Sequence, residues 1–230
     1  MALEGVLRGS DPIQVKRVTI LLYGDPGLGK TTLASTSSNP IMIDTDESAH
    51  RAALRDEEGA LRCAVMPVSN WAQLTRMSVA DFEGYDTIIV DTLGTSLDMA
   101  ALQIGGGRAL SVNQWGILKS QAGSWLDMIR GTGKDIVYVA HSIDKKIGDV
   151  TFAEAHIPGG TKQTVMRQAD MIGRLCSTAE GTMLSFNPST GGIGKNSARV
   201  PDSLIKDVSE MPDMLAKLIT RTKEAMNLGQ

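Results

Sequence analysis

The sequence predicts an α/β fold in which a mostly parallel sheet is flanked by helices and followed by a C-terminal antiparallel hairpin and a closing helix. Apolar runs rich in valine and isoleucine, such as residues 18–24 and 85–91, are typical of buried parallel strands. Segments with helical spacing separate these runs, as in repeated strand–helix–strand units. After residue 170, two strand-like runs are joined by a tight turn, which favours an antiparallel hairpin.

Length and charge set the limits for function. The 230 residues, 42% of them hydrophobic, predict one domain over 1–230 with an N-terminal extension at 1–15. No apolar run approaches the roughly 20 residues needed to cross a bilayer, and the first residues lack the apolar centre of a secretory signal. We therefore expect a soluble, cytoplasmic protein without membrane contacts. The net charge of -3 gives no overall basic footprint, so any DNA contact must be local.

Cys63 and Cys176 each lie among apolar residues in expected strands. Neither has a CxxC spacing or a histidine nearby. We therefore predict two buried, reduced thiols rather than metal ligands or a disulfide.

The first strand, residues 18–24, runs into a glycine-rich turn and then a helix that begins near Lys30. Residues 24–31 match the phosphate-loop pattern of Gly, any four residues, and Gly-Lys-Ser/Thr, which binds a nucleoside triphosphate. Glycines let backbone N–H groups surround the phosphates, Lys30 reaches the β- and γ-phosphates, and Thr31 binds Mg²⁺. The alternative is a glycine-rich turn without a ligand. The predicted nucleotide-binding residues are Gly24, Asp25, Pro26, Gly27, Leu28, Gly29, Lys30, Thr31 and Thr32.

Carboxylates follow the next two apolar strands. Residues 41–43 lead into Asp44, Asp46 and Glu47, where ligands gather in open α/β sheets, so one of these groups is a candidate for positioning the attacking water. Acidic residues in loops are also commonly solvated or helix-capping. The run at 85–94 delivers Asp91 to the same edge, where it can bind the water shell of Mg²⁺. Asp91 can equally cap the helix that follows, and both roles are compatible.

The middle of the chain predicts a strand at 61–68, a short helix at 69–78, a longer helix at 112–131 and a strand at 134–142. Within the longer helix, the residues expected in the core are Trp115, Leu118, Trp125 and Ile129. The last strand ends in His141 and Ser142. His141 is a candidate to face the γ-phosphate and report hydrolysis to the next loop, and a structural, hydrogen-bonded histidine is the alternative.

Two glycine-containing segments are expected to be flexible loops. Residues 143–162 show little periodicity, and residues 103–111 contain three consecutive glycines between helices. Loops of this kind order around nucleic acid in some proteins and are merely mobile in others. Charge supports DNA binding only weakly, because the lysines of the longer loop are balanced by Asp144, Asp149 and Glu154. The candidate DNA-binding residues are Arg108, Lys145, Lys146 and Lys162.

The last third of the sequence predicts the hairpin and the closing helix. Residues 171–178 and 181–188 form the strands of the hairpin, and a glycine-rich turn at 189–204 leads to an exposed basic pair, Lys195 and Arg199. Apolar residues at helical spacing predict an amphipathic helix over 209–229.

This order of motifs, from residue 15 to about 205, resembles the core of the RecA-like P-loop ATPases. It is most similar to the short phage-encoded members, which include phage nucleotide-binding AAA-domain proteins and single-strand annealing recombinases. In that resemblance, Asp46, with Glu47 beside it, stands in the place of a catalytic glutamate, and His141 stands where bacterial recombinases have a glutamine sensor. Both are departures from the family pattern.

The resemblance also implies how the remaining segments act. The loops at 103–111 and 143–162 match two DNA-binding loops, and Lys195 and Arg199 resemble basic residues that reach the γ-phosphate of a neighbouring subunit. The oligomerisation and DNA-binding domains that flank the core of the larger bacterial protein are not recognised.

The resemblance implies an ATP- and Mg²⁺-dependent single-stranded-DNA-binding protein of phage recombination or strand annealing. It would form a filament or ring in the cytoplasm of an infected bacterium and would work with other phage replication or recombination proteins. Two alternatives stay open. One is a P-loop ATPase that acts on a protein partner, as a loader or motor accessory does. The other is an ATP-bound annealing module that does not hydrolyse.

Overall fold

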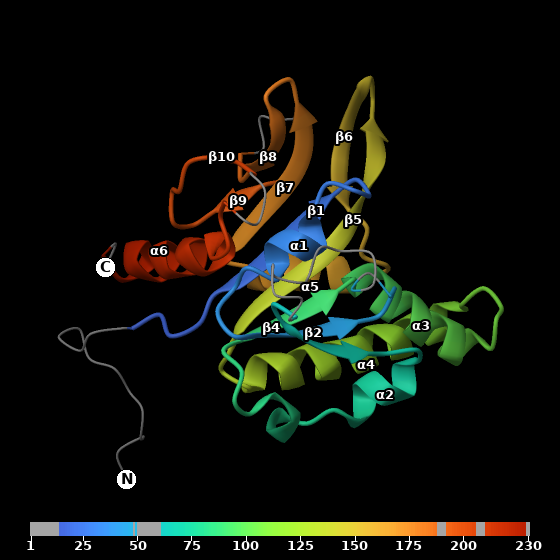
Figure 1. Cartoon of the computed structure of the whole chain (residues 1–230). Coiled ribbons are helices and arrows are strands. Elements are labelled where there is room, and N and C mark those ends of the chain that lie inside the picture. The colour runs from blue at the N-terminus through green and yellow to red at the C-terminus, as the bar shows by residue number, and fades with distance from the viewer. Residues whose placement is uncertain (1–13, 48, 50–60, 188–191, 206–209, 229–230) are drawn as a thin grey trace, which may run out of the picture.

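The structure is a computed structural model that describes residues 14–47, 49, 61–187, 192–205 and 210–228. The predicted α/β architecture is confirmed (Figure 1). The main path of the sheet has the order β10-β8-β7-β1-β5-β4-β2-β3, with β6 paired to β5 and β9 paired to β7. The strands are β1 (Thr19–Gly24), β2 (Pro40–Asp44), β3 (Ala64–Pro67), β4 (Thr87–Asp91), β5 (Asp135–Ile147), β6 (Val150–Ala155), β7 (Met171–Thr178), β8 (Gly181–Ser185), β9 (Lys195–Asn196) and β10 (Ser203–Leu204).

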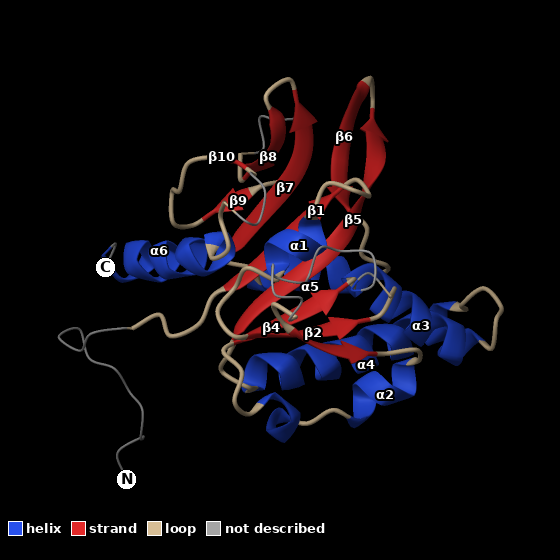
Figure 2. Ribbon diagram, in the orientation of Figure 1, coloured by secondary structure: helices blue, strands red, loops and turns tan. Residues whose placement is uncertain are grey.

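Helices cover both faces of the sheet because the central strands are apolar on both sides. Alternate residues of β1 enter two different cores: Leu21 and Tyr23 pack with α2, α3, α4 and α5, whereas Ile20 and Leu22 pack with α1 and α6. Figure 2 shows α2, α3 and α4 together on one side of the sheet. The helices are α1 (Lys30–Ala34), α2 (Trp71–Arg76), α3 (Leu93–Gly105), α4 (Val112–Gly131), α5 (Thr161–Gln168) and α6 (Met214–Leu228), with a 3-10 turn at Val79–Phe82.

The carboxyl ends of the parallel strands meet at one edge of the sheet. In register, Gly24 at the end of β1 lies beside His141 of β5, and Asp44 of β2 lies beside Asp91 of β4. The ends of these four strands, three of which carry a polar side chain, therefore come together beside the turn between β1 and α1.

The expectation of an irregular loop at 143–162 is wrong for most of its length. Strand β5 continues to Ile147 and turns at Gly148, which has a φ of 60°, into β6. The two strands form a hairpin that projects beyond the carboxyl edge of the sheet (Figure 1). Residues 143–146 lack a clear apolar alternation because this part of the hairpin extends past the sheet, so neither face is fully covered. Only residues 156–160, between β6 and α5, are without regular structure.

Two other expectations are adjusted, and two more concern segments that are only partly described. Trp115 is 43% exposed, whereas Leu118, Trp125 and Ile129 are buried, so the core begins one turn later in α4 than predicted. The closing helix begins at Met214, after Pro212, rather than at residue 209, which lies outside the described residues. The predicted extension at 1–15 and the turn at 189–204 lie partly outside the described residues as well.

Both cysteines are free thiols, as predicted. Cys63 is buried just before β3 rather than in a strand, and burial raises the pKa of its thiol to about 11. Cys176, in β7, is only half-buried. Within the described part of the chain, no helix combines the length and the apolar character that a membrane crossing requires.

Candidate nucleotide-binding site

Residues 25–29 form the turn between β1, which ends at Gly24, and α1, which begins at Lys30, in agreement with the strand, glycine-rich turn and helix expected around the phosphate-loop pattern. Gly27 and Gly29 both have a φ of 80°, a conformation that residues with a Cβ rarely adopt. Gly29 is the N-cap of α1, so the N–H groups of the first turn have no partner within the helix. The loop therefore presents backbone N–H donors near Lys30, the first residue of α1.

Lys30 is buried inside this turn, with only 6% of its surface exposed. Its Nζ donates a hydrogen bond to the backbone oxygen of Asp25 at 2.8 Å. Burial lowers the pKa of the Lys30 amine, while the carboxylates of Asp91, Asp25 and Asp46 act in the opposite direction. A triphosphate bound in the loop would add further negative charge beside this amine and stabilise its protonated form.

Asp91 is completely buried at the end of β4. The helix that follows is capped by Thr92, whose Oγ1 accepts a hydrogen bond from the N–H of Thr95 at 3.4 Å, so Asp91 is not the cap. The peptide bond between Asp91 and Thr92 is cis. The carboxylate of Asp91 interacts electrostatically with the amine of Lys30, across the same edge of the sheet.

Buried hydroxyl groups hold the ends of β2 and β4 together. Thr45 donates from its N–H to the oxygen of Asp91 at 2.8 Å and from its hydroxyl to the oxygen of Thr92 at 3.0 Å. The hydroxyl of Ser96 donates to that of Thr45 at 3.4 Å. Sequence patterns gave no signal for these residues, because a threonine or serine after a strand is equally common in ordinary turns.

His141, in β5, and Asp46, just after β2, lie near Lys30 of the phosphate loop. The Nε2 atom of His141 lies 3.6 Å from Oδ2 of Asp46. Burial, and then the positive charge of Lys30, lower the pKa of His141, while Asp46 raises it by a smaller amount. The lowered pKa favours the neutral form of the imidazole.

The two adjacent acidic residues after β2 have different surroundings. The side chain of Asp46 is 20% exposed and contacts His141, whereas Glu47 is exposed and has a φ of 57°. Asp44 is buried and accepts a hydrogen bond from the N–H of Ala49 at 3.1 Å, which gives it a structural role in the turn. The geometry favours Asp46 over Glu47 as the group beside the nucleotide.

Ser142 links the phosphate loop to β5, because its hydroxyl donates to the carboxylate of Asp25. The sequence marks Ser142 only as a polar residue after a strand. The contact connects the loop that surrounds the phosphates to the strand that carries His141 and continues into the β5–β6 hairpin.

The residues of this site fit a magnesium-bound triphosphate. Thr31 and Asp91 supply hard oxygen atoms of the kind that Mg²⁺ prefers, and Thr32, half-buried beside Thr31, lies in the same turn. Across the residues that the structure describes, no group of three His, Cys, Asp or Glu could hold a metal by itself. Mg²⁺ keeps several waters and takes phosphate oxygens as ligands, so two protein oxygens are sufficient.

The candidate DNA-binding residues lie outside this site and differ in their surroundings. Arg108 is exposed in the turn between α3 and α4, and Lys146 is exposed on the hairpin. Lys145 and Lys162 both contact the carboxylate of Glu154, at 3.7 and 2.5 Å. Glu154 is buried, so the charge of these two lysines is partly compensated within the protein.

The basic pair near the C-terminus is not equally exposed. Arg199 is exposed, but Lys195 is half-buried and its Nζ donates to the backbone oxygens of Ala169 and, at 3.4 Å, Arg167. Ala169 precedes β7, at the end of the sheet opposite the phosphate loop. The expectation of an exposed pair is therefore wrong for Lys195, because the start of β7 offers it carbonyl partners.

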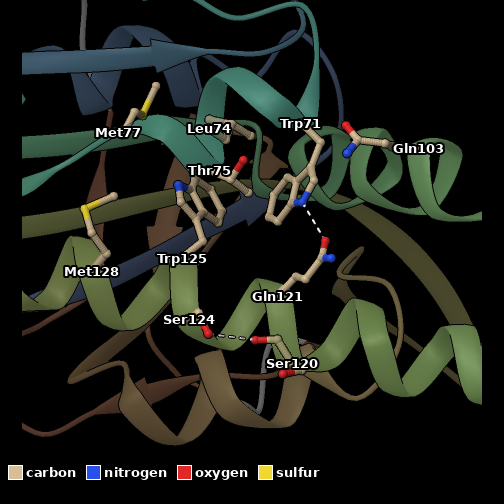
Figure 3. A pocket seen from close by; sticks show the side chains of 10 residues that line it. All are labelled: Trp71, Leu74, Thr75, Met77, Gln103, Ser120, Gln121, Ser124, Trp125 and Met128. Atoms are coloured by element: carbon tan, nitrogen blue, oxygen red, sulfur yellow. Dashed lines mark hydrogen bonds between the residues drawn. The ribbon is translucent and has the colours of Figure 1, made fainter.

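A separate cavity of about 400 Å³ lies between α2 and α4 (Figure 3). Trp71 and Trp125 meet there edge to face, with ring centres 5.4 Å apart, and Trp71 Nε1 donates to Oε1 of Gln121 at 3.0 Å. None of the residues that line this cavity is charged, so it does not suit a phosphate. The candidate nucleotide site is therefore the edge of the sheet at β1, β2, β4 and β5.

Comparison with known families gives one match that spans most of the described structure. A family model described as an AAA domain matches residues 16–198, from the start of β1 to the segment after β9. No curated protein matches the chain. The matched region contains the phosphate loop, Asp46, Asp91 and His141.

Proposed function

The chain belongs to the AAA-domain family of P-loop ATPases, and we propose that it hydrolyses ATP with Mg²⁺ in order to control the binding of single-stranded DNA in phage homologous recombination or strand annealing. The observation that carries the proposal is the position of the Asp46–His141 pair, 3.6 Å apart, beside Lys30 and the phosphate loop. Nucleotide binding by the loop alone would not require a carboxylate and a neutral imidazole at this place.

Each residue has a distinct role in the proposed reaction. The phosphate loop and Lys30 hold the β- and γ-phosphates, and Thr31 and Asp91 would hold Mg²⁺, which neutralises phosphate charge when bound. Asp46 orients the attacking water and accepts its proton. His141, whose lowered pKa favours the neutral imidazole, hydrogen-bonds near the γ-phosphate and passes the change on hydrolysis to β5 and its hairpin.

Replacing Asp46 by Asn is expected to lower the turnover number for ATP hydrolysis about 100-fold or more, because an amide cannot accept the proton of the attacking water. Glu47→Gln is the matched control, since Glu47 is adjacent in the chain but exposed, and it should leave the rate close to that of the wild type. The measurement is phosphate release at saturating ATP. Equal rates of release for all three proteins would remove Asp46 from the mechanism, whereas no release above background by the wild type would favour the annealing module that does not hydrolyse.

The DNA part of the proposal depends on how the hairpin is attached to the site. Strand β5 passes from His141 directly to Lys145 and Lys146, so a movement at the γ-phosphate is transmitted along one continuous strand. Arg108, in the turn between the two long helices, adds a second basic position. These residues would contact the phosphates of the strand, and hydrolysis would release it.

We also propose that the active form is a homo-oligomer, a filament or a ring. Arg199 is exposed and is available to reach the γ-phosphate of a neighbouring subunit, as an arginine finger does. Lys195 is tied to the start of β7 and is a weaker candidate for that role. Such an assembly would work in the cytoplasm of the infected host with other phage replication or recombination proteins.

The proposed function is tested by titrating the wild-type protein with a labelled oligothymidylate in the presence of Mg²⁺ and a non-hydrolysable ATP analogue. We expect binding that requires the nucleotide and weakens steeply with salt, since each phosphate contact releases a counterion. Lys146→Ala should lower the slope of log affinity against log salt by about one, whereas Lys16→Ala, exposed before β1, should not. No binding at low salt would defeat the DNA part of the proposal.

One observation favours a second candidate, an ATPase that acts on a protein partner. The buried carboxylate of Glu154 compensates both Lys145 and Lys162, which leaves the hairpin less positive than its sequence suggests. If ATP hydrolysis depends on Asp46 but is indifferent to single-stranded DNA, this second function is the better interpretation.

A further inference from the structure

In the sequence, an exposed tryptophan lies between the two segments proposed to contact DNA. Trp115, in the first turn of α4, is 43% exposed. Val112, three residues before it, is 88% exposed, and Lys119, four residues after it, is exposed as well. Residues at these spacings share one helix face, so an apolar group, an aromatic ring and a cation form a single surface that faces solvent.

The ring of Trp115 is held in place by the segment between β6 and α5. A Cβ on Gly159 would lie 3.0 Å from Cζ3 of Trp115, and a Cβ on Gly160 would lie 3.4 Å from Cδ of Lys119. Gly159 has a φ of 64° and presents only its backbone to the six-membered ring. The glycine pair thus fixes the ring without a side chain that would cover it.

Two stretches of sequence that contain Trp115 or contact it have no acidic residues. Residues 99–126, which include the end of α3 and most of α4, contain Arg108 and Lys119 and no Asp or Glu. Residues 155–169, which include α5, contain the exposed Arg167 and Lys162, whose charge Glu154 partly compensates, and no Asp or Glu. In a chain of net charge -3, this is a local surface that fits a polyanion.

The glycine pair is also connected to the nucleotide site. The N–H of His156 donates to the backbone oxygen of His141 at 2.8 Å, and Gly159 follows three residues later. If His141 moves when nucleotide binds, the short segment 156–159 would transmit that movement to the ring of Trp115.

We propose that Trp115 is a stacking platform for a nucleobase of single-stranded DNA, with Arg108 and Lys119 contacting the flanking phosphates. The inference rests on the proposed function and adds a binding residue to it. Aromatic rings beside cations bind single strands without sequence preference, because every base has a π-face. A second copy of the chain could also cover an apolar helix face, but the absence of acidic residues over 99–126 favours a polyanion.

Tryptophan fluorescence gives a direct test. Of the three tryptophans, Trp71 and Trp125 are 1% and 3% exposed and contact each other inside the protein (Figure 3), so a quencher that stacks from solvent acts on Trp115. With Mg²⁺ and a non-hydrolysable ATP analogue, oligothymidylate should quench the emission of the wild type and leave that of Trp115→Leu unchanged. Trp115→Leu should bind the strand about tenfold more weakly, and Trp115→Phe should retain most of the affinity.

An abasic strand separates stacking from other roles of Trp115. This probe keeps the phosphates and lacks the bases, so the wild type and Trp115→Leu should bind it equally. Unquenched emission and equal affinity for oligothymidylate would overturn the inference while leaving the DNA function intact. Equal weakening on both strands, together with loss of self-association in sedimentation, would assign the surface to a second copy instead. Failure of the wild type to bind either strand would reject the DNA function first, and this inference with it.

Discussion

Replacing Lys30 by Ala is expected to lower the specificity constant for ATP hydrolysis by about 100- to 1000-fold, which is the usual cost of removing one preorganised donor from a developing anionic charge. Lys30 is the buried cation of the phosphate loop, and its Nζ lies 2.8 Å from the Asp25 oxygen, among Asp91, Asp25 and Asp46. Without the amine, those carboxylates face the triphosphate directly, so binding as well as turnover should weaken.

The measurement is steady-state phosphate release, with nucleotide binding followed separately by a fluorescent ATP analogue. Lys16→Ala is the control, because Lys16 is exposed before β1 and should behave like the wild type. The far-UV circular dichroism spectra of all three proteins should be the same. Burying the Lys30 amine costs free energy of desolvation, so its removal does not disrupt the hydrophobic core. Hydrolysis by Lys30→Ala at a rate near that of the wild type would show that the phosphate loop is not the catalytic site.

The glycine-rich turn after β1 and the polar ends of the neighbouring strands could be predicted because each can be recognised in a short stretch of sequence. The phosphate loop is contiguous, and parallel strands buried on both faces are recognisable as apolar runs that end in polar residues. Asp91 and His141 follow such runs, and parallel pairing then brings their strand ends to one edge. Their proximity is a consequence of this pairing, which joins strands far apart in the sequence and which the apolar runs alone do not specify.

The β5–β6 hairpin and Trp115 could not be predicted, for two different physical reasons. Beyond Ser142, β5 leaves the sheet and pairs with β6, so its side chains no longer alternate between a core and solvent. Periodicity places Trp115 and Leu118 on related faces of α4, but it does not tell how far that helix extends past its neighbours. Leu118 is 1% exposed and Trp115 is 43% exposed because the first turn of α4 reaches beyond the core.

The choice between Asp46 and Glu47 also required the fold. Both follow the same strand and carry the same charge, and a pattern cannot distinguish adjacent carboxylates at a turn. The positive φ of Glu47 leaves its side chain exposed, while Asp46 lies within 3.6 Å of His141. The backbone conformation at this turn therefore distinguishes the two acids, because it places Asp46 and not Glu47 beside His141.

Gly24→Ala is expected to have the largest effect on stability. Gly24 is the last residue of β1, and a Cβ there would lie 2.3 Å from the backbone oxygen of Leu175 and 3.2 Å from its Cβ. Leu175 belongs to β7, the strand paired with β1, so the clash is with backbone that cannot rotate away. We expect a loss of about 2–4 kcal/mol in the free energy of unfolding, or roughly 5–15 °C in melting temperature for a domain of this size.

Gly27→Ala is the matched control for this substitution, because it places the same methyl group in the same loop. Nothing lies within 4 Å of a Cβ on Gly27, and only its φ of 80° opposes the change, at a cost of about 1 kcal/mol. Thermal unfolding of the two variants thus compares packing against β7 with backbone strain alone. If Gly24→Ala melts at or above the temperature of Gly27→Ala, the end of β1 is not packed against β7 as described. The arrangement that places the phosphate loop beside His141 would then be wrong as well, because Gly24 is in register with both Leu175 and His141.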